Sequence, residues 1–506
     1  MRPFLFSSML LLWLGLLAGV TSAQSRGAYH DNGKLPEGSV GEHIQALLDV
    51  LADPEPEAIR QLVKERFAPT FRDAFPHGDD PYGGHVAQLS RLHGSSLGYD
   101  FVAIREYEDG GNPGEVVVIL QNRLTDVFEA IVMQTEQQPP HLIAGLSLSP
   151  ARAPSNRPAP GPLSPAEVVA ELEAFVAKVS EADVFSGTVL LARDDQVLFR
   201  SACGLASKRF TVPNHIDTKF NLGSMNKMFT GVAITRLAQD GKLSLQDPIS
   251  KYLDDDWLPN VDKSQVRIEH LLTHTSGLGS YFNQRFMESS RALFREVDDY
   301  RPLLEEETLA FEPGSRWQYS NSGMFVLGVI IEKVTGQSYF DVIRQLIYRP
   351  AHMQSSDSYD MDEPVPNLAI GYEKEDSPSG VRWRNNLYQH VIRGGPAGGG
   401  FSTVDDLYAF ARALTGERLL DAEHTALALS AKPDIGSDAY GYGFGLSGSP
   451  QNRIVGHSGG FNGISANLSI YLDRGWITVV LSNYGGAAQI VQRKMDNLLS
   501  RVADGG

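Results

Sequence analysis

Cysteine is almost absent from this chain. Cys203 is the single cysteine among 506 residues, so no disulfide can form within the chain and stability must come from burial of an apolar core. Cys203 follows a predicted strand in the segment Ser-Ala-Cys-Gly, without the cationic surroundings that activate a thiol. We therefore do not expect it to act as a nucleophile.

Basic residues and metal-binding patterns are also scarce. The 44 Lys and Arg residues against 61 Asp and Glu residues give a formal net charge of -17, which repels phosphate backbones and argues against nucleic acid as a partner. The 13 histidines form no His-Glu-x-x-His pattern and no Cys-rich spacing, so we expect no metal and no cofactor. The 42% hydrophobic and 21% charged residues are typical of a globular chain, and its length predicts two or three domains.

Long apolar runs are confined to the N-terminus. Arg2 precedes the apolar run 4–20, and the small residues Thr21-Ser22-Ala23 follow it. This pattern predicts a signal peptide over residues 1–23 and export to the periplasm or the medium. The alternative is an uncleaved anchor, but no basic stop-transfer cluster follows. No later stretch is apolar enough to cross a bilayer, so we expect no stable membrane insertion after cleavage.

Residues 40–150 predict a small α+β domain. Its helices are expected at about 43–51, 57–66 and 86–92, and three or four strands should follow, three of them at 115–120, 127–133 and 142–148. This order resembles the small NTF2-like or cystatin-like modules, and we find no catalytic constellation in it. The polar residues 24–38 are expected to be loose, and the proline-rich residues 151–163 to form a linker.

Residues 164–503 predict the second domain. Ser164, Pro165 and Glu167 form a capping box at the start of a helix. A hairpin (187–191 and 197–200), two late strands (464–472 and 476–482) and a last helix (487–501) enclose a mostly helical middle. This arrangement predicts an antiparallel sheet flanked by helices, with an all-helical subdomain.

The first candidate catalytic element is Ser224-Met225-Asn226-Lys227, which opens a predicted helix. A spacing of three puts Ser224 and Lys227 on one helix face, and the unpaired backbone N–H of Ser224 can face an oxyanion. A neutral lysine can take the serine proton if burial or a nearby cation lowers its pKa. Such pairs also arise by chance, although Ser224 is the only serine in the chain with a lysine three residues on.

The second candidate element is Tyr319-Ser320-Asn321. Tyr319 can serve as a general base if cations, Lys227 among them, hold it as a phenolate, and Asn321 can hydrogen-bond the lysine and a substrate amide. Tyr281-Phe282-Asn283 offers a competing version of the pattern. We favour Tyr319, because a Pro-Gly turn precedes it and small residues that begin a helix follow it.

The third candidate element is His457-Ser458-Gly459-Gly460, directly before a predicted strand. Glycines let a strand edge approach a ligand closely, and the N–H of Gly460 could be a second oxyanion donor. Taken alone, the segment is more typical of the glycine-rich start of a hairpin. His274, in a predicted helix-to-turn segment, is expected to be structural.

These three elements, in this order, resemble the class C β-lactamase and penicillin-binding-protein-like serine hydrolase family. Phe185-Ser186-Gly187, the segment 270–278 and the segment 397–403 resemble the same family, and together the likeness covers about residues 165–500. It implies a β-lactamase/transpeptidase-like α+β fold and an acyl-enzyme on Ser224. It further implies Lys227 and Tyr319 as the proton-transfer pair, Ser224 and Gly460 as the oxyanion hole, and substrate binding by Asn321, His457, Ser458 and Gly459.

His457 departs from the family pattern. Class C β-lactamases carry a lysine there, and members with histidine are more often esterase-like or peptidase-like, so efficient β-lactamase activity is not expected. An unperturbed histidine titrates near about 6.5, so we expect the rate to depend on pH through His457.

The sequence thus predicts an exported serine hydrolase that cleaves an amide or ester bond of a small-molecule or peptide substrate. One alternative is a penicillin-binding D-alanyl-D-alanine carboxypeptidase or a β-lactamase. Another is a catalytically silent binding protein on the same fold, which the presence of Ser224 and Lys227 disfavours. Segments 280–310 and 360–395 are expected to wall the cleft, because they are long, irregular and contain aromatic residues. The sequence leaves the oligomeric state open.

Overall fold

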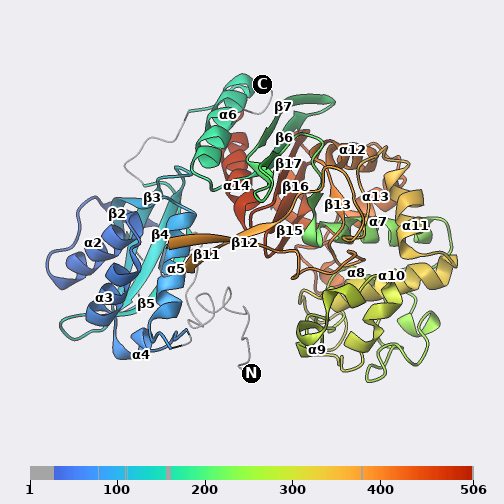
Figure 1. Cartoon of the computed structure of the whole chain (residues 1–506), viewed down its shortest axis with the longest axis horizontal. Helices are drawn as coiled ribbons and strands as arrows, with labels where there is room; N and C mark the ends of the chain where they lie inside the picture. The colour runs from blue at the N-terminus through green and yellow to red at the C-terminus, as the bar shows by residue number, and fades with distance from the viewer. Residues whose placement is uncertain are drawn as a thin grey trace. The chain divides into compact units, whose positions relative to one another are not determined.

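The computed structural model describes residues 28–77, 79–108, 110, 112–154, 161–377 and 380–503. The expected signal peptide (1–23) lies outside the described residues, as does the middle of the expected linker. The chain divides into two compact units between Pro162 and Leu163 (Figure 1). Within the described ranges, every helix is too short or too polar to cross a membrane.

The first unit is a five-stranded antiparallel sheet with helices packed on one face. Residues from the helices and from alternate strand positions, such as Leu51, Leu62, Leu89, Leu120 and Met133, share one apolar core. The sheet order is β1-β2-β3-β4-β5. The elements are α2 (Ser39–Ala52), α3 (Pro56–Arg66), α4 (Pro69–Arg72), α5 (Gly83–Gly94), β1 (Tyr29–Asn32), β2 (Tyr99–Tyr107), β3 (Glu115–Asn122), β4 (Phe128–Thr135) and β5 (Ile143–Pro150).

Two strands of this sheet, β1 and β2, fall outside the predicted strand ranges. Residues 24–38 were expected to be loose, but Tyr29–Asn32 forms β1 and pairs with β2. Asp31 of β1 forms an ion pair with Arg105 of β2, at 2.8 Å between Oδ1 and Nε, and both side chains are fully buried. The expectation is wrong because this polar strand is fixed by a partner more than seventy residues away, which no local pattern reveals.

The second unit is built on a six-stranded antiparallel sheet in the order β14-β15-β16-β17-β6-β7. Pairing of β17 with β6 joins the two ends of the unit. Helices α6 and α14 pack on one face and α12 on the other, as Figure 1 shows. The sheet and its helices are β6 (Gly187–Arg193), β7 (Gln196–Cys203), β14 (Gly445–Ser449), β15 (Asn452–Phe461), β16 (Ile464–Tyr471), β17 (Trp476–Ser482), α6 (Pro165–Glu181), α12 (Val404–Thr415) and α14 (Ala487–Ser500).

The predicted capping box at the start of α6 is confirmed. The backbone N–H of Ser164 donates to Oε2 of Glu167 at 2.8 Å, and the N–H of Glu167 donates to Oγ of Ser164 at 3.3 Å. The hairpin, the two late strands and the last helix also form close to their expected bounds.

Between β7 and β14 lies the expected helical region. It contains α7 (Asn226–Gln239), α8 (Ile268–Leu272), α9 (Gln284–Glu288), α10 (Asn321–Thr335), α11 (Tyr339–Ile343) and α13 (Ala422–Ala428), together with the π-helical turn η6 (Arg344–Tyr348). Short strands interrupt it: β8 (Leu205–Ser207), β9 (Val212–Pro213), β10 (Phe220–Asn221), β11 (Tyr372–Ser377), β12 (Gly380–Asn385) and β13 (Phe401–Ser402). The predicted α+β fold class agrees with this architecture, but the subdomain is not all-helical as predicted, because these short strands interrupt it.

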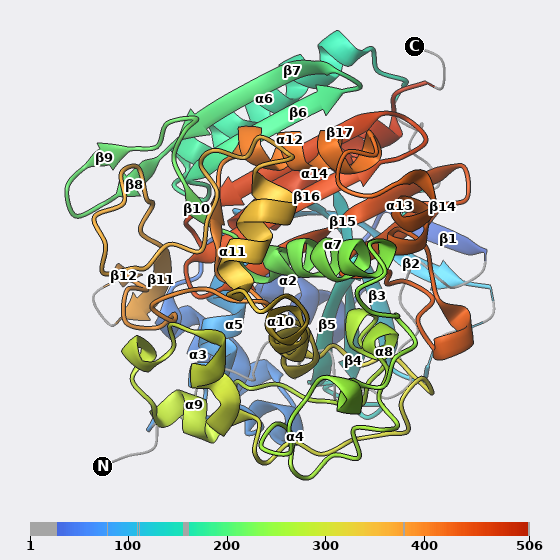
Figure 2. The ribbon, with the colours of Figure 1, turned by 90° about the vertical axis from the view of Figure 1, so that its right-hand side faces the viewer.

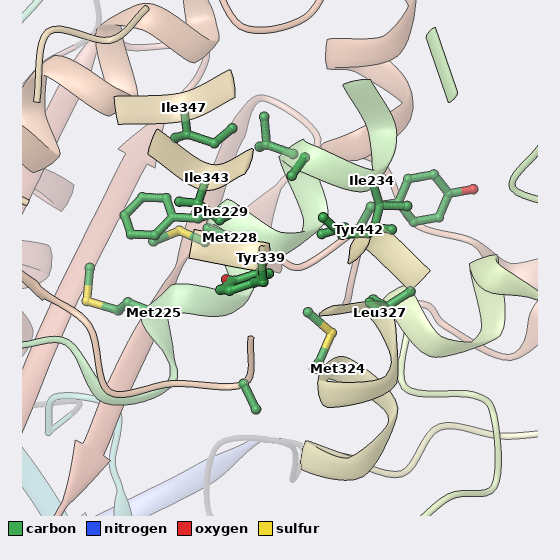
Figure 3. Packing of buried hydrophobic residues seen from close by; sticks show 14 of the residues in the cluster. Met225, Met228, Phe229, Ile234, Met324, Leu327, Tyr339, Ile343, Ile347 and Tyr442 are labelled. Atoms are coloured by element: carbon green, nitrogen blue, oxygen red, sulfur yellow. The ribbon is translucent and has the colours of Figure 1, made fainter. Parts of the chain in front are cut away.

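Helix α7 is the central element of this region (Figure 2). Its first ten residues are all buried. Met228 and Phe229 pack among Ile343 and Ile347 (Figure 3). Thr230 shares a hydrogen bond of 2.9 Å with the hydroxyl of Tyr339 and donates one of 2.8 Å to the carbonyl of Pro396. The start of α7 is therefore fixed from several directions.

Candidate active site

Ser224 lies in a 3-10 turn, η2 (Gly223–Met225), directly before α7. The sequence predicted that Ser224 itself opens the helix, whereas the α-helix begins at Asn226. Gly223 has φ +50°, and a Cβ there would lie 2.8 Å from the backbone nitrogen of Gly460. The turn that carries Ser224 thus touches β15, and only glycine fits at position 223.

Lys227 lies beneath Ser224 and is completely buried. Its Nζ is 3.0 Å from Oγ of Ser224, 2.9 Å from Oδ1 of Asn321 and 2.5 Å from the carbonyl oxygen of Ala397. Burial holds the pKa of Lys227 well below its ordinary value of 10.5. A neutral amine has two N–H donors and one lone pair. The oxygens of Asn321 and Ala397 can only accept, so they take the two N–H donors of the amine. The lone pair is then left to accept the hydroxyl hydrogen of Ser224.

The carbonyl of Ala397 belongs to the glycine-rich loop 394–400, which α7 holds in place. The side-chain amide of Asn226 donates to the carbonyl of Gly395 at 3.2 Å and accepts from the N–H of Gly400 at 3.2 Å. Sequence reasoning connected this segment with the family but did not predict that it contacts the lysine. Every residue has a backbone carbonyl, so no sequence pattern could have revealed the contact between Lys227 and Ala397.

Tyr319 lines the cleft together with Ser224, and burial raises the pKa of Tyr319 to about 12. Nζ of Lys227 lies 4.9 Å from the centre of its ring. Burial lowers the pKa of Lys227 and raises that of Tyr319, so it disfavours both charged forms and argues against the expectation that the lysine holds Tyr319 as a phenolate. The competing Tyr281 packs edge-on against Phe325, at 5.4 Å between ring centres, and forms part of the cleft wall.

Asn321 is positioned by the start of α10. Oγ of Ser320 caps that helix by accepting from the N–H of Gly323 at 2.8 Å. The amide nitrogen of Asn321 donates to Oγ of Ser280 at 3.2 Å, which turns its oxygen toward Lys227. The predicted contact between Asn321 and the lysine is present.

His274 is fully buried, and its backbone has φ +60°. Its Nδ1 accepts from the N–H of Ser320 at 3.2 Å. Its ring lies between those of Tyr319 and Tyr440, at 4.4 and 4.5 Å between centres. His274 thus supports the Tyr319 ring from behind, and Tyr440 is a part of the site that the sequence did not indicate.

His457 lies within β15 rather than before a strand. Its Nδ1 is 2.5 Å from the carbonyl of Ser458, which only accepts, so Nδ1 carries the proton and Nε2 accepts from the hydroxyl of Tyr440 at 2.8 Å. Burial is the main cause that lowers the pKa of His457 to about 3. The expectation of a titration near 6.5 does not hold in these surroundings, because the ring is neutral across the working pH range.

A cleft of about 240 Å³ opens beside Ser224. Of the predicted site residues, Ser224, Tyr319, Asn321 and Gly460 line it, whereas Lys227, His457, Ser458 and Gly459 lie outside its lining. The two segments expected to wall the cleft both do so, and this prediction is confirmed. They contribute Tyr281, Phe282, Phe286, Gln389, His390 and Val391.

The family model for beta-lactamase matches residues 171–501. The chain belongs to the beta-lactamase family. Penicillin-binding protein 4* of Bacillus subtilis is 33% identical over 328 residues, which cover 62% of this chain and 71% of that protein. Esterase EstB of Burkholderia gladioli is 31% identical over 241 residues, 44% of this chain and 59% of the esterase.

A solved structure of a penicillin-binding protein from Bacillus halodurans matches with a TM-score of 0.58 at 29% identity. The match covers 64% of this chain and 98% of that one. The expected β-lactamase/transpeptidase-like fold is confirmed, and this member of the beta-lactamase family is a serine hydrolase.

The close contact between β15 and the Ser224 turn gives a first prediction. A Cβ at Gly459 would lie 1.8 Å from the carbonyl oxygen of Leu222, so Gly459→Ala must push the strand away from Ser224. We expect kcat/KM toward a chromogenic aryl acetate to fall by about 100-fold, since a shift of about 1 Å costs that much. In the control Gly445→Ala, the nearest atom is 3.6 Å away, and activity should be retained. Equal activity of the two variants would contradict the contact.

The neutral His457 gives a second prediction. Because its pKa lies near 3, its protonation state does not change between pH 5 and pH 8. We expect the pH profile of kcat/KM to keep its shape over that range in His457→Gln, even if the absolute rate falls. The prediction fails if kcat/KM of the unmodified chain changes with a midpoint near about pH 6.5 and this change is lost in the variant. The histidine would then titrate as a free imidazole.

Proposed function

We propose that the chain is an exported hydrolase that cleaves an amide or ester bond through an acyl-enzyme on Ser224. The observation that carries the proposal is the 3.0 Å contact between Oγ of Ser224 and Nζ of a completely buried Lys227. A lysine kept neutral by burial is a base at working pH, and a serine beside it is an activated nucleophile.

Acylation begins when the Oγ–H proton of Ser224 passes to Nζ of Lys227 and Oγ attacks the acyl carbon. The lysine becomes an ammonium ion, which Asn321 and the carbonyl of Ala397 stabilise through their oxygens. The charge that develops on the substrate oxygen is stabilised by the backbone N–H groups of Ser224 and Gly460. The contact between the Ser224 turn and β15 supports this pairing.

Tyr319 is proposed to complete the proton transfer. As a phenol beside Ser224 in the cleft, it can give its proton to the leaving group, and the nearby Lys227 ammonium then restores that proton. Water attacks the acyl-enzyme along the reverse path, giving one proton back to Ser224 as the acid departs. In this scheme His457, Ser458 and Gly459 do not touch the reacting atoms. They hold Tyr440 and the edge of β15 in place.

A penicillin-binding carboxypeptidase or a β-lactamase is the second candidate. The names of two relatives, in Bacillus subtilis and Bacillus halodurans, favour it. Esterase EstB favours the ester branch instead. A silent binding protein is the weakest candidate, because the serine, the lysine and the tyrosine are in contact.

The remaining parts of the chain are proposed as follows. Residues 1–23 act as the export signal, and residues 40–150 together with β1 (Tyr29–Asn32) form the small N-terminal domain. Residues 151–163 link it to residues 164–503, which form the hydrolase domain. The division of the chain after Pro162 supports this last boundary.

The assignment of the nucleophile is testable with a fluorophosphonate probe. We expect one covalent adduct by intact mass, mapped to Ser224, and no adduct in Ser224→Ala. Hydrolysis of an aryl ester should fall by at least about 1,000-fold in that variant. Cys203→Ser is the matched control: burial raises the pKa of this thiol, so the variant should still be labelled. An adduct that persists in Ser224→Ala would refute the assignment.

A further inference from the structure

No charged side chain is found among the described residues that line the cleft beside Ser224. Asp, Glu, Lys and Arg are all missing from the described residues that line it. Its polar groups are neutral amides, hydroxyls and one imidazole, such as Asn221, Asn321, Gln389 and His390. Any charge on a bound substrate would therefore meet dipoles but no counter-ion.

The cationic side chains near the cleft are already engaged. Lys227 is buried beneath Ser224 with three partners. Arg291 stacks on the ring of Phe286 from behind the wall, at 4.0 Å from its centre. Its Nε donates to the carbonyl of Gln389 at 3.1 Å and its Nη1 to that of Ser289 at 2.8 Å. His457 accepts a hydrogen bond from Tyr440 instead of offering a charge, and burial lowers the pKa of His390, the imidazole in the lining.

Aromatic rings form the apolar side of the same cleft. Phe282 lies nearly parallel to Phe461, with 5.9 Å between ring centres and 19° between planes. Phe282 also meets Phe286 edge-on at 4.9 Å. Phe461 directly follows Gly460 at the end of β15, so this aromatic surface begins one residue from the proposed oxyanion donor.

We propose that the substrate is an ester or amide that carries an apolar group of aromatic size on its acyl side and no carboxylate next to the scissile bond. This inference rests on the proposed acyl-enzyme function and narrows its substrate class. It separates the chain from enzymes that remove a C-terminal amino acid, because such substrates place a carboxylate beside the bond that breaks. The aromatic surface around Phe282 binds the acyl group, and the uncharged remainder of the cleft accepts a neutral leaving group.

Matched thioesters test both parts of the proposal. The full chain is assayed with phenylacetyl thioglycolamide, phenylacetyl thioglycolate and acetyl thioglycolamide. The released thiol is measured by absorbance with a chromogenic thiol reagent. In each case the C–S bond breaks, the acyl group passes to Oγ of Ser224, and the thiol leaves. The first two substrates differ only in the charge of the leaving group, and the first and third only in the size of the acyl group.

We expect kcat/KM for the neutral phenylacetyl thioester to exceed that of its carboxylate by at least about tenfold, since a desolvated charge without a partner is costly. It should also exceed that of the acetyl thioester by at least about tenfold, because the larger group buries more apolar surface. Equal or faster turnover of the carboxylate, or no preference for phenylacetyl, overturns the inference and leaves the proposed function intact. Thiol release no faster than in Ser224→Ala overturns the proposed function itself.

Phe282→Ala tests the assigned binding surface. The variant should lose about tenfold in kcat/KM for the phenylacetyl thioester and little for the acetyl thioester. Phe210→Ala is the control, because that ring is 72% exposed and does not line the cleft. An equal loss on both substrates would show that Phe282 supports the structure of the site and does not select the acyl group.

Discussion

The buried amine of Lys227 is the interaction on which the rest of the site depends. Its three partners come from three places far apart in the sequence: the Ser224 turn, the start of α10 at Asn321, and the loop carbonyl of Ala397. Helix α7 fixes the first place through its buried face and the third through the amide of Asn226, and the Ser320 cap fixes the second. The fold thus brings the proposed nucleophile and base together with neutral acceptors, and none of these partners of the lysine is a carboxylate.

Burial sets the protonation of this site more than ion pairing does. It lowers the pKa of Lys227 and of His457 and raises that of Tyr319, so burial favours the neutral form of all three groups. Neutral groups can exchange one proton along a short path without first separating charge. The described residues that line the cleft likewise include no Asp, Glu, Lys or Arg. The inferred preference for an uncharged substrate follows from this neutral lining.

Local patterns predicted the parts of the fold that local physics decides. The capping box of Ser164 and Glu167, the hairpin of β6 and β7, and the spacing of Ser224 and Lys227 all depend on neighbours within a few residues. The order of the three motifs led to the family, which the match over residues 171–501 shows. The parts that were missed depend on distant partners. Strand β1 depends on Arg105, the lysine contact on the carbonyl of Ala397, and the protonation of His457 on Tyr440 and on burial.

The most direct test of the account is the titration of Lys227 in the folded chain. Lysine labelled with ¹³C at Cε would be followed by NMR from pH 5 to pH 11, and the resonance absent in Lys227→Met would identify the residue. The account predicts a midpoint well below 10.5, with the rate of Ser224 acylation rising through the same midpoint, because the neutral amine is the active form. A Lys227 that stays an ammonium ion up to pH 10 while the enzyme is active at pH 7 would contradict it.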